Sequence, residues 1–243
     1  MKKMISVIVP CYNEEKSVLQ LHEIISQVFA KELLEYDYDI IYVDDYSKDK
    51  TRNQIKILCD CDKEHVNVTN FGFSRNVFSA LSLADGDAAF LVFGDLQNPP
   101  ELLPEFVREW EKGNKVVIGQ KQGSDEKKIM RFMRSLYYEA INILSDKSQI
   151  KQFNGYGLYD RSFIEILRQI DDIQPYLKQV VAEYSPDYDT IYYQQRASNR
   201  GKSNFNFYKN YDFAMEGITS STKKIMRLST ICGVTLGIFS FIY

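Results

Sequence analysis

Short apolar runs recur along the chain, each bounded by polar or turn-forming residues. Such a run is typical of a strand that helices cover on both faces. The last-but-one run is followed by Asp95 and then by two prolines, which cannot continue a hydrogen-bonded ladder. We therefore predict strands over residues 5–9, 38–45, 66–72, 89–93 and 115–120.

Segments with a helical period separate these runs. Residues 73–84 predict a helix, and another is expected to begin near Glu101. Because strands and helices alternate, we predict an α/β fold with a mostly parallel sheet flanked by helices. The clearest helix follows Glu14 and Glu15, where five residues spaced by about three or four positions predict one buried face: Val18, Leu21, Ile25, Val28 and Phe29.

The pattern is looser in the second half. Residues 127–146 resemble an amphipathic helix with a basic face, residues 153–170 a turn or strand that leads into a helix, and residues 189–198 a strand that returns to the sheet. No linker rich in Pro, Gly or Ser interrupts the chain. We therefore expect one domain over residues 1–204 and an amphipathic juxtamembrane segment over residues 205–227.

The last part of the chain carries no charge over 16 residues, from 228 to 243. A membrane span needs roughly 20 residues, so this segment predicts the start of a transmembrane helix that is cut short. Lys223, Lys224 and Arg227 precede it, as cytoplasmic flanks of membrane helices do. The alternative is a C-terminal core helix, although the segment has no polar stripe to face water.

Composition narrows the class of protein. The formal net charge is −3, so the whole chain lacks the basic signature of a nucleic-acid binder, and no nucleic-acid partner is expected. The four cysteines are too scattered for a disulfide framework, which favours a reducing cytosolic setting. The chain opens directly into a predicted strand, without a secretory signal.

Carboxylates stand where predicted strands end. Asp44 and Asp45 close the second run, and Asp95 follows the fourth. Ligands of open α/β sheets bind outside the carboxyl ends of the strands, so these side chains are candidates for a binding site. The alternative is local: turn chemistry within residues 44–49, and capping of the following helix by Asp95 and its neighbours.

Three motifs at these strand ends carry a family resemblance: "PCYNEE" at residues 10–15, "VDDYSKDKT" at 43–51 and "GDLQNPPE" at 94–101. In this order they resemble family 2 glycosyltransferases of GT-A (Rossmann-like) fold, in the polyprenyl-phosphate branch that includes dolichol-phosphate mannosyltransferase and bactoprenol glucosyltransferase. The resemblance runs from about residue 5 to the chain end. It implies that residues 1–204 form the glycosyltransferase domain.

The resemblance also implies a site for a nucleotide sugar. A carboxylate is suited to accept hydrogen bonds from a base N–H and a ribose hydroxyl, while Tyr12 offers an apolar face. The positions that match the family motifs are Pro10, Tyr12, Asn13, Glu14, Asp44, Asp45, Gly72, Asp95 and Gln97.

Asp95 resembles the last acid of the family's D-x-D motif, which holds Mg²⁺ or Mn²⁺ against the diphosphate. The resemblance therefore makes Asp95 the expected metal ligand and a catalytic residue. Four positions depart from the family pattern. Phe93 stands at the first acid of D-x-D, and Phe73 where Lys or His is usual; Gly155 and Gly157 stand at the positions of another acid and of an arginine.

A basic stretch, "QQRASNRGKSNFNFYKNY" at residues 194–211, resembles the family's R-x-G-x-S-K segment. The resemblance implies that Arg196, Arg200, Lys202 and Ser203 bind the donor and acceptor phosphates, with Arg200 in a catalytic role. The alternative is a solvated loop that forms a membrane-facing charge patch.

The expected activity is inverting transfer of a sugar from a nucleotide diphosphate sugar, with uridine favoured, to a membrane polyprenyl phosphate at the cytoplasmic face. A phosphate monoester is largely ionised at neutral pH, since its second pKa is about 6, so the acceptor needs no enzyme base. The expected partners are donor, acceptor and membrane, and homo-oligomerisation is left open. The alternatives are a transferase acting on a saccharide or protein hydroxyl, and a catalytically silent nucleotide-sugar-binding scaffold.

Overall fold

The structure is a computed structural model that describes residues 2–58, 63–122, 150, 152–172, 175–185, 187–196, 215 and 224–242. By its contacts the chain divides into two compact units. The first comprises residues 1–124 and 152–204, and the second comprises residues 125–151 and 205–243. The amphipathic helix predicted over residues 127–146 lies outside the described residues.

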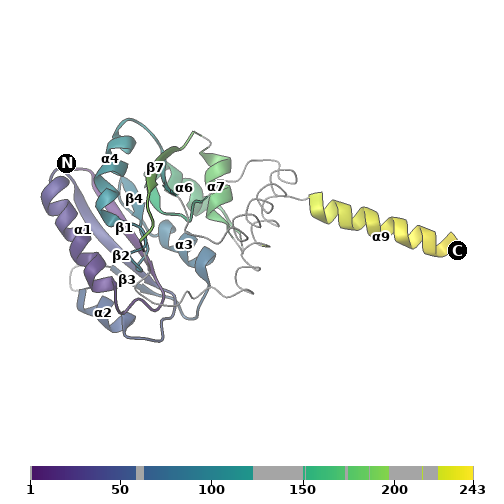
Figure 1. The fold of residues 1–243 in the computed structure, drawn as a ribbon, viewed down its shortest axis with the longest axis horizontal. Helices are drawn as coiled ribbons and strands as arrows, with labels where there is room; N and C mark the ends of the chain where they lie inside the picture. Colours follow the sequence, from purple (N-terminus) through teal and green to yellow (C-terminus); the bar gives the residue numbers. More distant parts are fainter. Residues whose placement is uncertain are drawn as a thin grey trace. The chain divides into compact units, whose positions relative to one another are not determined.

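The first unit is built on a seven-stranded sheet with strand order β3-β2-β1-β4-β6-β5-β7. Figure 1 shows this sheet among its helices. Every neighbouring pair is parallel except those of β6, which runs antiparallel to β4 and to β5. The prediction of a mostly parallel α/β sheet is therefore confirmed. The strands are β1 (Met4–Cys11), β2 (Asp37–Asp44), β3 (Lys63–Val66), β4 (Ala88–Leu91), β5 (Val116–Lys121), β6 (Gly157–Asp160) and β7 (Asp189–Tyr193).

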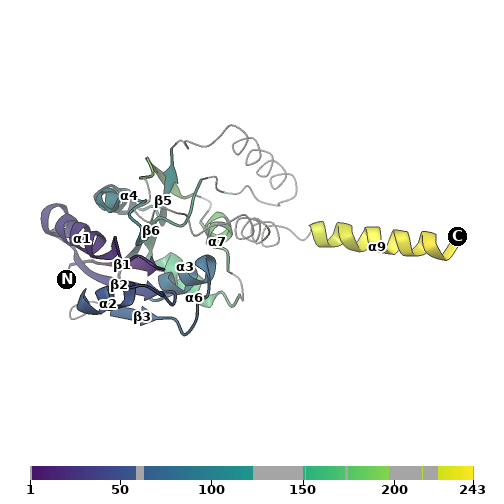
Figure 2. The same ribbon diagram turned by 60° about the horizontal axis from the view of Figure 1, so that its bottom comes forward.

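Helices cover both faces of this sheet. One group comprises α1 (Val18–Glu32), α2 (Thr51–Leu58) and α4 (Leu103–Glu111), and the other comprises α3 (Phe73–Ser82), α6 (Arg161–Gln169) and α7 (Leu177–Tyr184). The sheet runs between the two groups in Figure 2. Helix α1 buries the five residues that its sequence period predicts, namely Val18, Leu21, Ile25, Val28 and Phe29.

The third strand was predicted in the wrong place. The pattern predicts residues 66–72, whereas β3 spans Lys63–Val66. The ladder ends where the Asn67 N–H donates to the Asp44 carbonyl of β2 at 3.0 Å. Beyond it, long-range hydrogen bonds take over: the Asn67 side-chain amide and the N–H groups of Phe71 and Gly72 donate to the Asp45 carboxylate. A β-prone run thus becomes a loop because a buried carboxylate binds it.

The exit of β4 also differs from the prediction. The strand ends at Leu91, although the apolar run continues to Phe93 and Asp95 follows only after Gly94. Asp95 does not cap the next helix, since neither the 3₁₀ helix η1 (Pro100–Leu102) nor α4 has a side-chain cap hydrogen bond. The local capping alternative for Asp95 is therefore wrong.

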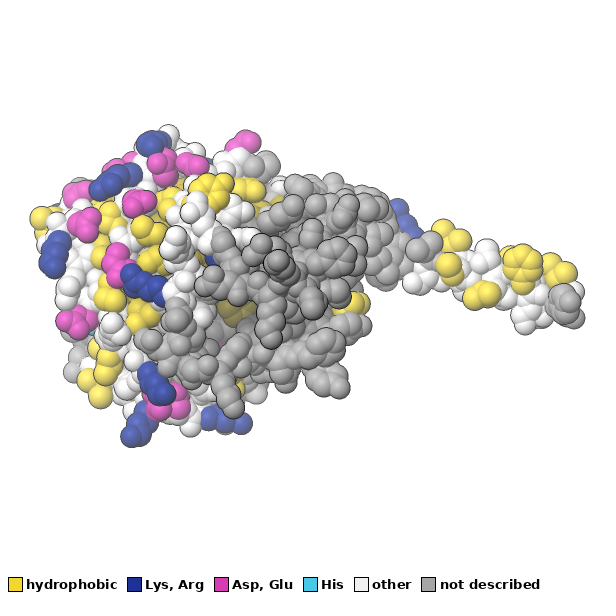
Figure 3. Space-filling view, viewed as in Figure 1, with side chains coloured by type: hydrophobic (Ala, Val, Ile, Leu, Met, Phe, Trp, Pro, Cys, Tyr) yellow, Lys and Arg dark blue, Asp and Glu magenta, His cyan; other side chains and the backbone are white. Residues whose placement is uncertain are grey.

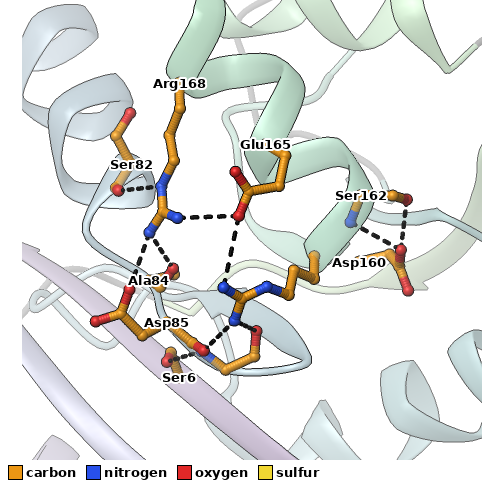
Figure 4. A network of polar contacts seen from close by, with 10 residues as sticks. Ser6, Ser82, Ala84, Asp85, Asp160, Ser162, Glu165 and Arg168 are labelled. Carbon is orange, nitrogen blue, oxygen red and sulfur yellow. Dashed lines mark hydrogen bonds and ion pairs between the residues drawn. The ribbon is translucent and has the colours of Figure 1, made fainter.

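The amino end of β4 is fixed to α6 by arginine (Figure 4). The Nε of Arg168 donates to the Ser82 carbonyl at 2.9 Å, and its Nη2 donates to the Ala84 carbonyl at 2.7 Å and to Asp85 at 3.0 Å. Its Nη1 pairs with Glu165 at 3.0 Å. The Arg168 guanidinium therefore ties the turn before β4 to α6, and that of Arg161, also in α6, donates to the Asp85 and Gly86 carbonyls of the same turn.

In the second unit the structure describes helix α9, Lys224–Ile242. It begins four positions before the predicted start at residue 228. The described side chains from Ser229 onward are exposed, and Figure 3 shows hydrophobic side chains along the helix. Among the described residues, no helix has both the length and the apolar character needed to cross a membrane.

Candidate active site

The three motif loops meet at one edge of the sheet. Strands β2, β1 and β4 are adjacent and mutually parallel, so the loops that follow them leave from the same edge. Pro10 is buried within β1 opposite Val43 of β2, and Tyr12 follows the strand and is half-buried. This is the edge at which α/β enzymes bind ligands, as the strand-end carboxylates predict.

The loops after β1 and β2 are interlocked. The Asn13 N–H donates to Ser47 Oγ at 2.9 Å, and the Lys48 N–H donates back to Asn13 Oδ1 at 2.9 Å. The Glu14 N–H donates to Thr51 Oγ1 at 2.6 Å. These reciprocal bonds join residues 12–15 and 45–51 into one platform.

Asp44 is fully buried at the end of β2. One carboxylate oxygen accepts from the Ser47 N–H at 3.1 Å, and the other accepts from the Ser47 hydroxyl. The turn chemistry considered as an alternative for this residue is therefore present. It does not exclude ligand binding, because a carboxylate offers about four lone-pair positions.

Asp45 organises a different loop. Its Oδ1 accepts from the Asn67 amide at 2.9 Å and from the Phe71 N–H at 2.7 Å, and its Oδ2 accepts from the Gly72 N–H at 3.1 Å. Gly72 has a φ of 84°, which a glycine tolerates without strain. Asp45 thus sets the start of α3, a role that sequence reasoning missed because its partners lie more than 20 residues away.

The side chain of Glu14 packs against Gly94 in the third motif loop. Its side chain is buried, and its Cγ lies 2.9 Å from the position that a Cβ would take at Gly94, where Cys11 Sγ lies at 3.3 Å. Any larger residue at position 94 would collide with the glutamate. The glycine before Asp95 is therefore required by the close passage of the β4 exit over Glu14.

The Asp95 loop has a tight turn. Asp95 Oδ1 accepts from the Gln97 N–H at 3.1 Å, and Leu96 adopts a left-handed φ of 57°. Burial raises the pKa of the Asp95 carboxyl above its ordinary value, against a smaller lowering effect of backbone hydrogen bonds. A desolvated carboxylate of this kind is stabilised by a cation.

Asp95 is the expected metal ligand at this edge. Within the described ranges no three His, Cys, Asp or Glu side chains are grouped to hold a metal. Mg²⁺ commonly binds through one or two carboxylates plus substrate phosphates. The first acid position of D-x-D offers no ligand, since Phe93 is buried with its ring centroid 5.3 Å from that of Phe73.

The side chains of Gln97 and Arg196 both form hydrogen bonds with other side chains of the protein. Gln97 Oε1 accepts from Gln195 Nε2 at 2.8 Å. The Arg196 guanidinium donates to Glu101 Oε1 at 3.2 and 3.1 Å. Arg196 thus faces η1, and its phosphate contact stays a prediction.

Of the predicted site residues, the structure brings together at this edge Pro10, Tyr12, Asn13, Glu14, Asp44, Asp45, Gly72, Asp95 and Gln97. Arg200, Lys202 and Ser203 lie outside the described residues, and their roles stay predictions. Sequence reasoning missed Ser47 and Thr51, which lock the platform; the turn signal "SKDKT" marks both.

Comparisons with known proteins agree with this geometry. The family model for glycosyl transferase family 2 matches residues 6–165. The bactoprenol glucosyl transferase of Shigella phage SfV is 27% identical over 243 residues, covering 98% of this chain and 78% of that protein.

Solved structures match the fold. Glucosyl-3-phosphoglycerate synthase from Mycobacterium tuberculosis, in complex with Mn²⁺, UDP and phosphoglyceric acid, gives a TM-score of 0.61 at 16% identity over 88% of this chain and 75% of that one. The mannosyltransferase PcManGT from Pyrobaculum calidifontis, in complex with GDP-Man and Mn²⁺, gives 0.54 at 15% identity over 83% and 59%. At these identities the likeness shows the GT-A-like fold alone.

The family match covers the three motif loops and most of the sheet, and it favours sugar transfer over a catalytically silent scaffold. The chain belongs to glycosyl transferase family 2 and is a glycosyltransferase.

Proposed function

We propose that this glycosyltransferase moves a sugar from a nucleotide diphosphate sugar to a membrane polyprenyl phosphate, with inversion at the anomeric carbon. The observation that carries the proposal is the half-buried Asp95 carboxylate, held beside the platform of the first two loops and without a cationic partner among the described ion pairs. The name of the phage relative, a bactoprenol glucosyl transferase, supports the acceptor class.

The first two loops would bind the nucleoside. Asp44 and Glu14 are buried acceptors suited to a base N–H and to ribose hydroxyls, and half-buried Tyr12 gives an apolar face for the base. Their platform is fixed by hydrogen bonds before a ligand arrives, which reduces the ordering cost of binding. We propose uridine as the base, as the family resemblance favours it.

Asp95 would hold Mg²⁺ or Mn²⁺ together with the donor diphosphate. When bound, the ion neutralises charge that develops on the departing nucleoside diphosphate. The raised pKa of Asp95 supports this role, because a cation compensates the carboxylate for its lost hydration. Phe93 is buried and packs against Phe73, so Asp95 is the carboxylate of this loop that would hold the ion.

The acceptor needs no enzyme base, because its phosphate oxygen is the nucleophile and is already ionised. Position 155 supports this preference over a hydroxyl acceptor. Gly155 has a φ of 108°, and a Cβ there would lie 3.2 Å from Leu91 and 3.3 Å from Leu177. A carboxylate at this position would be strained and surrounded by apolar atoms, so it is poorly suited to act as a base.

The basic stretch would bind the phosphates through Arg196, Arg200, Lys202 and Ser203. The pair that Arg196 forms with Glu101 is half-exposed, and such pairs contribute about 0–1 kcal/mol. A phosphate would therefore compete readily for this guanidinium. Gly201 permits a close approach of the backbone to an anionic group.

We also propose that α9 contacts the membrane at its cytoplasmic face, where the acceptor resides. The exposed hydrophobic side chains of this helix include Ile231, Leu236 and Phe239. Exposed Arg227 lies at its basic start and would attract anionic headgroups.

Mass spectrometry of lipid products tests the proposal. The protein is incubated with a short-chain polyprenyl phosphate, Mg²⁺ or Mn²⁺, and a panel of sugar nucleotides; the expected product is the polyprenyl phosphate sugar, absent when EDTA is added. The variant Asp95→Asn is assayed beside the wild type. Its matched control is Asp171→Asn, because Asp171 is exposed. Transfer to a saccharide hydroxyl, with none to the lipid, would instead support the hydroxyl-acceptor alternative.

A further inference from the structure

The Asp95 loop is bonded along its length to the exit of β7, about 100 residues later in the chain. Gln195 Nε2 donates to Gln97 Oε1 at 2.8 Å, and the Arg196 N–H donates to the Gln97 carbonyl at 3.1 Å. One step further along, Asn98 Nδ2 donates to the Tyr193 hydroxyl at 2.6 Å. Three hydrogen bonds thereby join the Asp95 loop to the end of β7 and the two residues that follow Gln194.

Gln97 is the centre of this contact. Its N–H donates to Asp95 Oδ1 at 3.1 Å, while its side chain and its carbonyl accept from Gln195 and Arg196. An unbroken path of hydrogen bonds therefore leads from the Asp95 carboxylate to Arg196, the first basic residue of the basic stretch. Movement of either segment would disturb the other.

The three bonds across the contact differ in character. Asn98 and Tyr193 are buried, so their bond belongs to the core beneath the loop. The Arg196 bond uses backbone atoms, which a side-chain change does not remove. Gln195 is half-buried and reaches the loop through its side-chain amide, so it can be altered alone.

We propose that Gln195 is a positioning residue for sugar transfer: by holding Gln97, it keeps Asp95 and the first residues of the basic stretch at one fixed spacing. This inference rests on the proposed function, in which Asp95 serves the donor diphosphate and the basic stretch serves the acceptor phosphate. Reaction requires these two groups to be aligned, and misplacement by about 1 Å is enough to reduce the rate.

The experiment compares three variants with the wild-type full chain. Gln195→Ala removes the donor, and Gln195→Met removes it while keeping a side chain of similar length. Gln194→Ala is the matched control, because Gln194 is the same residue type at the next position and is exposed. Thermal unfolding establishes that each variant folds.

The first readout is amide hydrogen exchange without metal or substrate. Loss of one neutral hydrogen bond predicts exchange of amides 95–101 faster by roughly 2- to 12-fold in both Gln195 variants, with no change in Gln194→Ala. The second readout is steady-state kinetics, in which kcat falls by at least that factor while uridine binding and the donor KM change little.

The outcomes are separable. A wild type that forms no polyprenyl phosphate sugar would defeat the proposed function, whereas the exchange result stands without turnover. Unchanged exchange in both Gln195 variants overturns the inference. So does faster exchange with an unchanged kcat, because the bond would then be structural and without effect on alignment.

Discussion

The amino ends of the parallel strands form one edge of the sheet, the amino edge, and their carboxyl ends form the other, the carboxyl edge. Acidic side chains at the two edges have different partners. At the amino edge, acids face cations: Arg168 pairs with Asp85 and Glu165, and Lys115 pairs with Asp160 at 3.1 Å. At the carboxyl edge, Asp45 accepts only from N–H groups and Asp44 only from Ser47 in the contacts given above. None of the ion pairs found among the described residues involves Asp44, Asp45 or Asp95.

The difference indicates which edge is complete without a ligand. The amino edge is stabilised within the folded protein itself, by hydrogen bonds from arginine to main-chain carbonyls and by ion pairs with carboxylates. The carboxyl edge keeps a desolvated carboxylate at Asp95, whose raised pKa reflects the cost of burying its charge. A cation brought by the donor would remove that cost, so function is expected at the carboxyl edge and structural support at the other.

The largest effect is expected from Asp95→Asn. We predict a loss of turnover on the order of 100- to 1,000-fold, because charge stabilisation of the leaving diphosphate depends on this carboxylate. The assay uses saturating Mn²⁺, with Asp171→Asn as the control. Near-normal turnover would exclude Asp95 as the principal metal ligand.

The same variant has a predicted stability effect with a defined sign. The pKa of Asp95 is raised by folding, so its ionised form destabilises the native state as pH rises through that pKa. Asp95→Asn should therefore raise the melting temperature at neutral pH, and the gain should vanish below about pH 4, the ordinary range of Asp. A melting temperature that is lower at neutral pH would contradict the desolvation argument.

Arg200→Ala should give the next largest effect. If the basic stretch binds phosphates, losing one charge-assisted hydrogen bond removes about 1.5 to 3 kcal/mol, or roughly 10- to 150-fold in turnover. Uridine binding, measured by calorimetry, should be unchanged because the first two loops hold the nucleoside. Equal losses in both would place Arg200 at the nucleoside or in the fold.

Asp45→Asn tests how much the Asp45 carboxylate stabilises the loop that it binds at the carboxyl edge. An amide offers one acceptor oxygen where the carboxylate accepts three N–H groups, so we expect a loss of about 1.5 to 3 kcal/mol in the free energy of unfolding. Urea denaturation measures it. No change in stability would mean that the bonds to Asn67, Phe71 and Gly72 contribute little.

Arg168→Ala should lower the stability of the folded protein, by removing hydrogen bonds at the amino edge, without affecting catalysis. The Ser82 and Ala84 carbonyls lose their donor, which predicts a loss of about 1 to 3 kcal/mol in the free energy of unfolding. At 25 °C kcat should stay within a factor of about two. Lys112→Ala is the control, since its exposed pair with Glu109 should contribute under about 1 kcal/mol. A large fall in kcat for folded Arg168→Ala would show that the edges are coupled.

The sequence predicts the first part of this molecule well, for physical reasons. Helix α1 has one strongly periodic apolar face, and β1, β2 and β4 are apolar runs that only a covered sheet accommodates. The carboxyl ends of parallel strands lie at the same edge of a sheet. The strand assignments therefore predicted that the three motif loops converge. Local pattern alone sufficed for these elements.

What the sequence did not predict depends on distant partners. Residues 67–72 have the composition of a strand, yet Asp45 draws them into a loop. The contact between Gln97 and Gln195 spans 98 positions, and no periodicity marks it. Gly94 reads as an ordinary turn residue until the buried side chain of Glu14 is placed beneath it.

The most direct test of function at the carboxyl edge is calorimetric titration of UDP into the wild type and Asp95→Asn, each with and without Mn²⁺. We predict that Mn²⁺ strengthens UDP binding to the wild type, and that this gain is lost in Asp95→Asn while uridine binds both proteins equally. The same Mn²⁺-dependent gain in both proteins would contradict the assignment of Asp95 and of this edge as the place where metal and diphosphate meet.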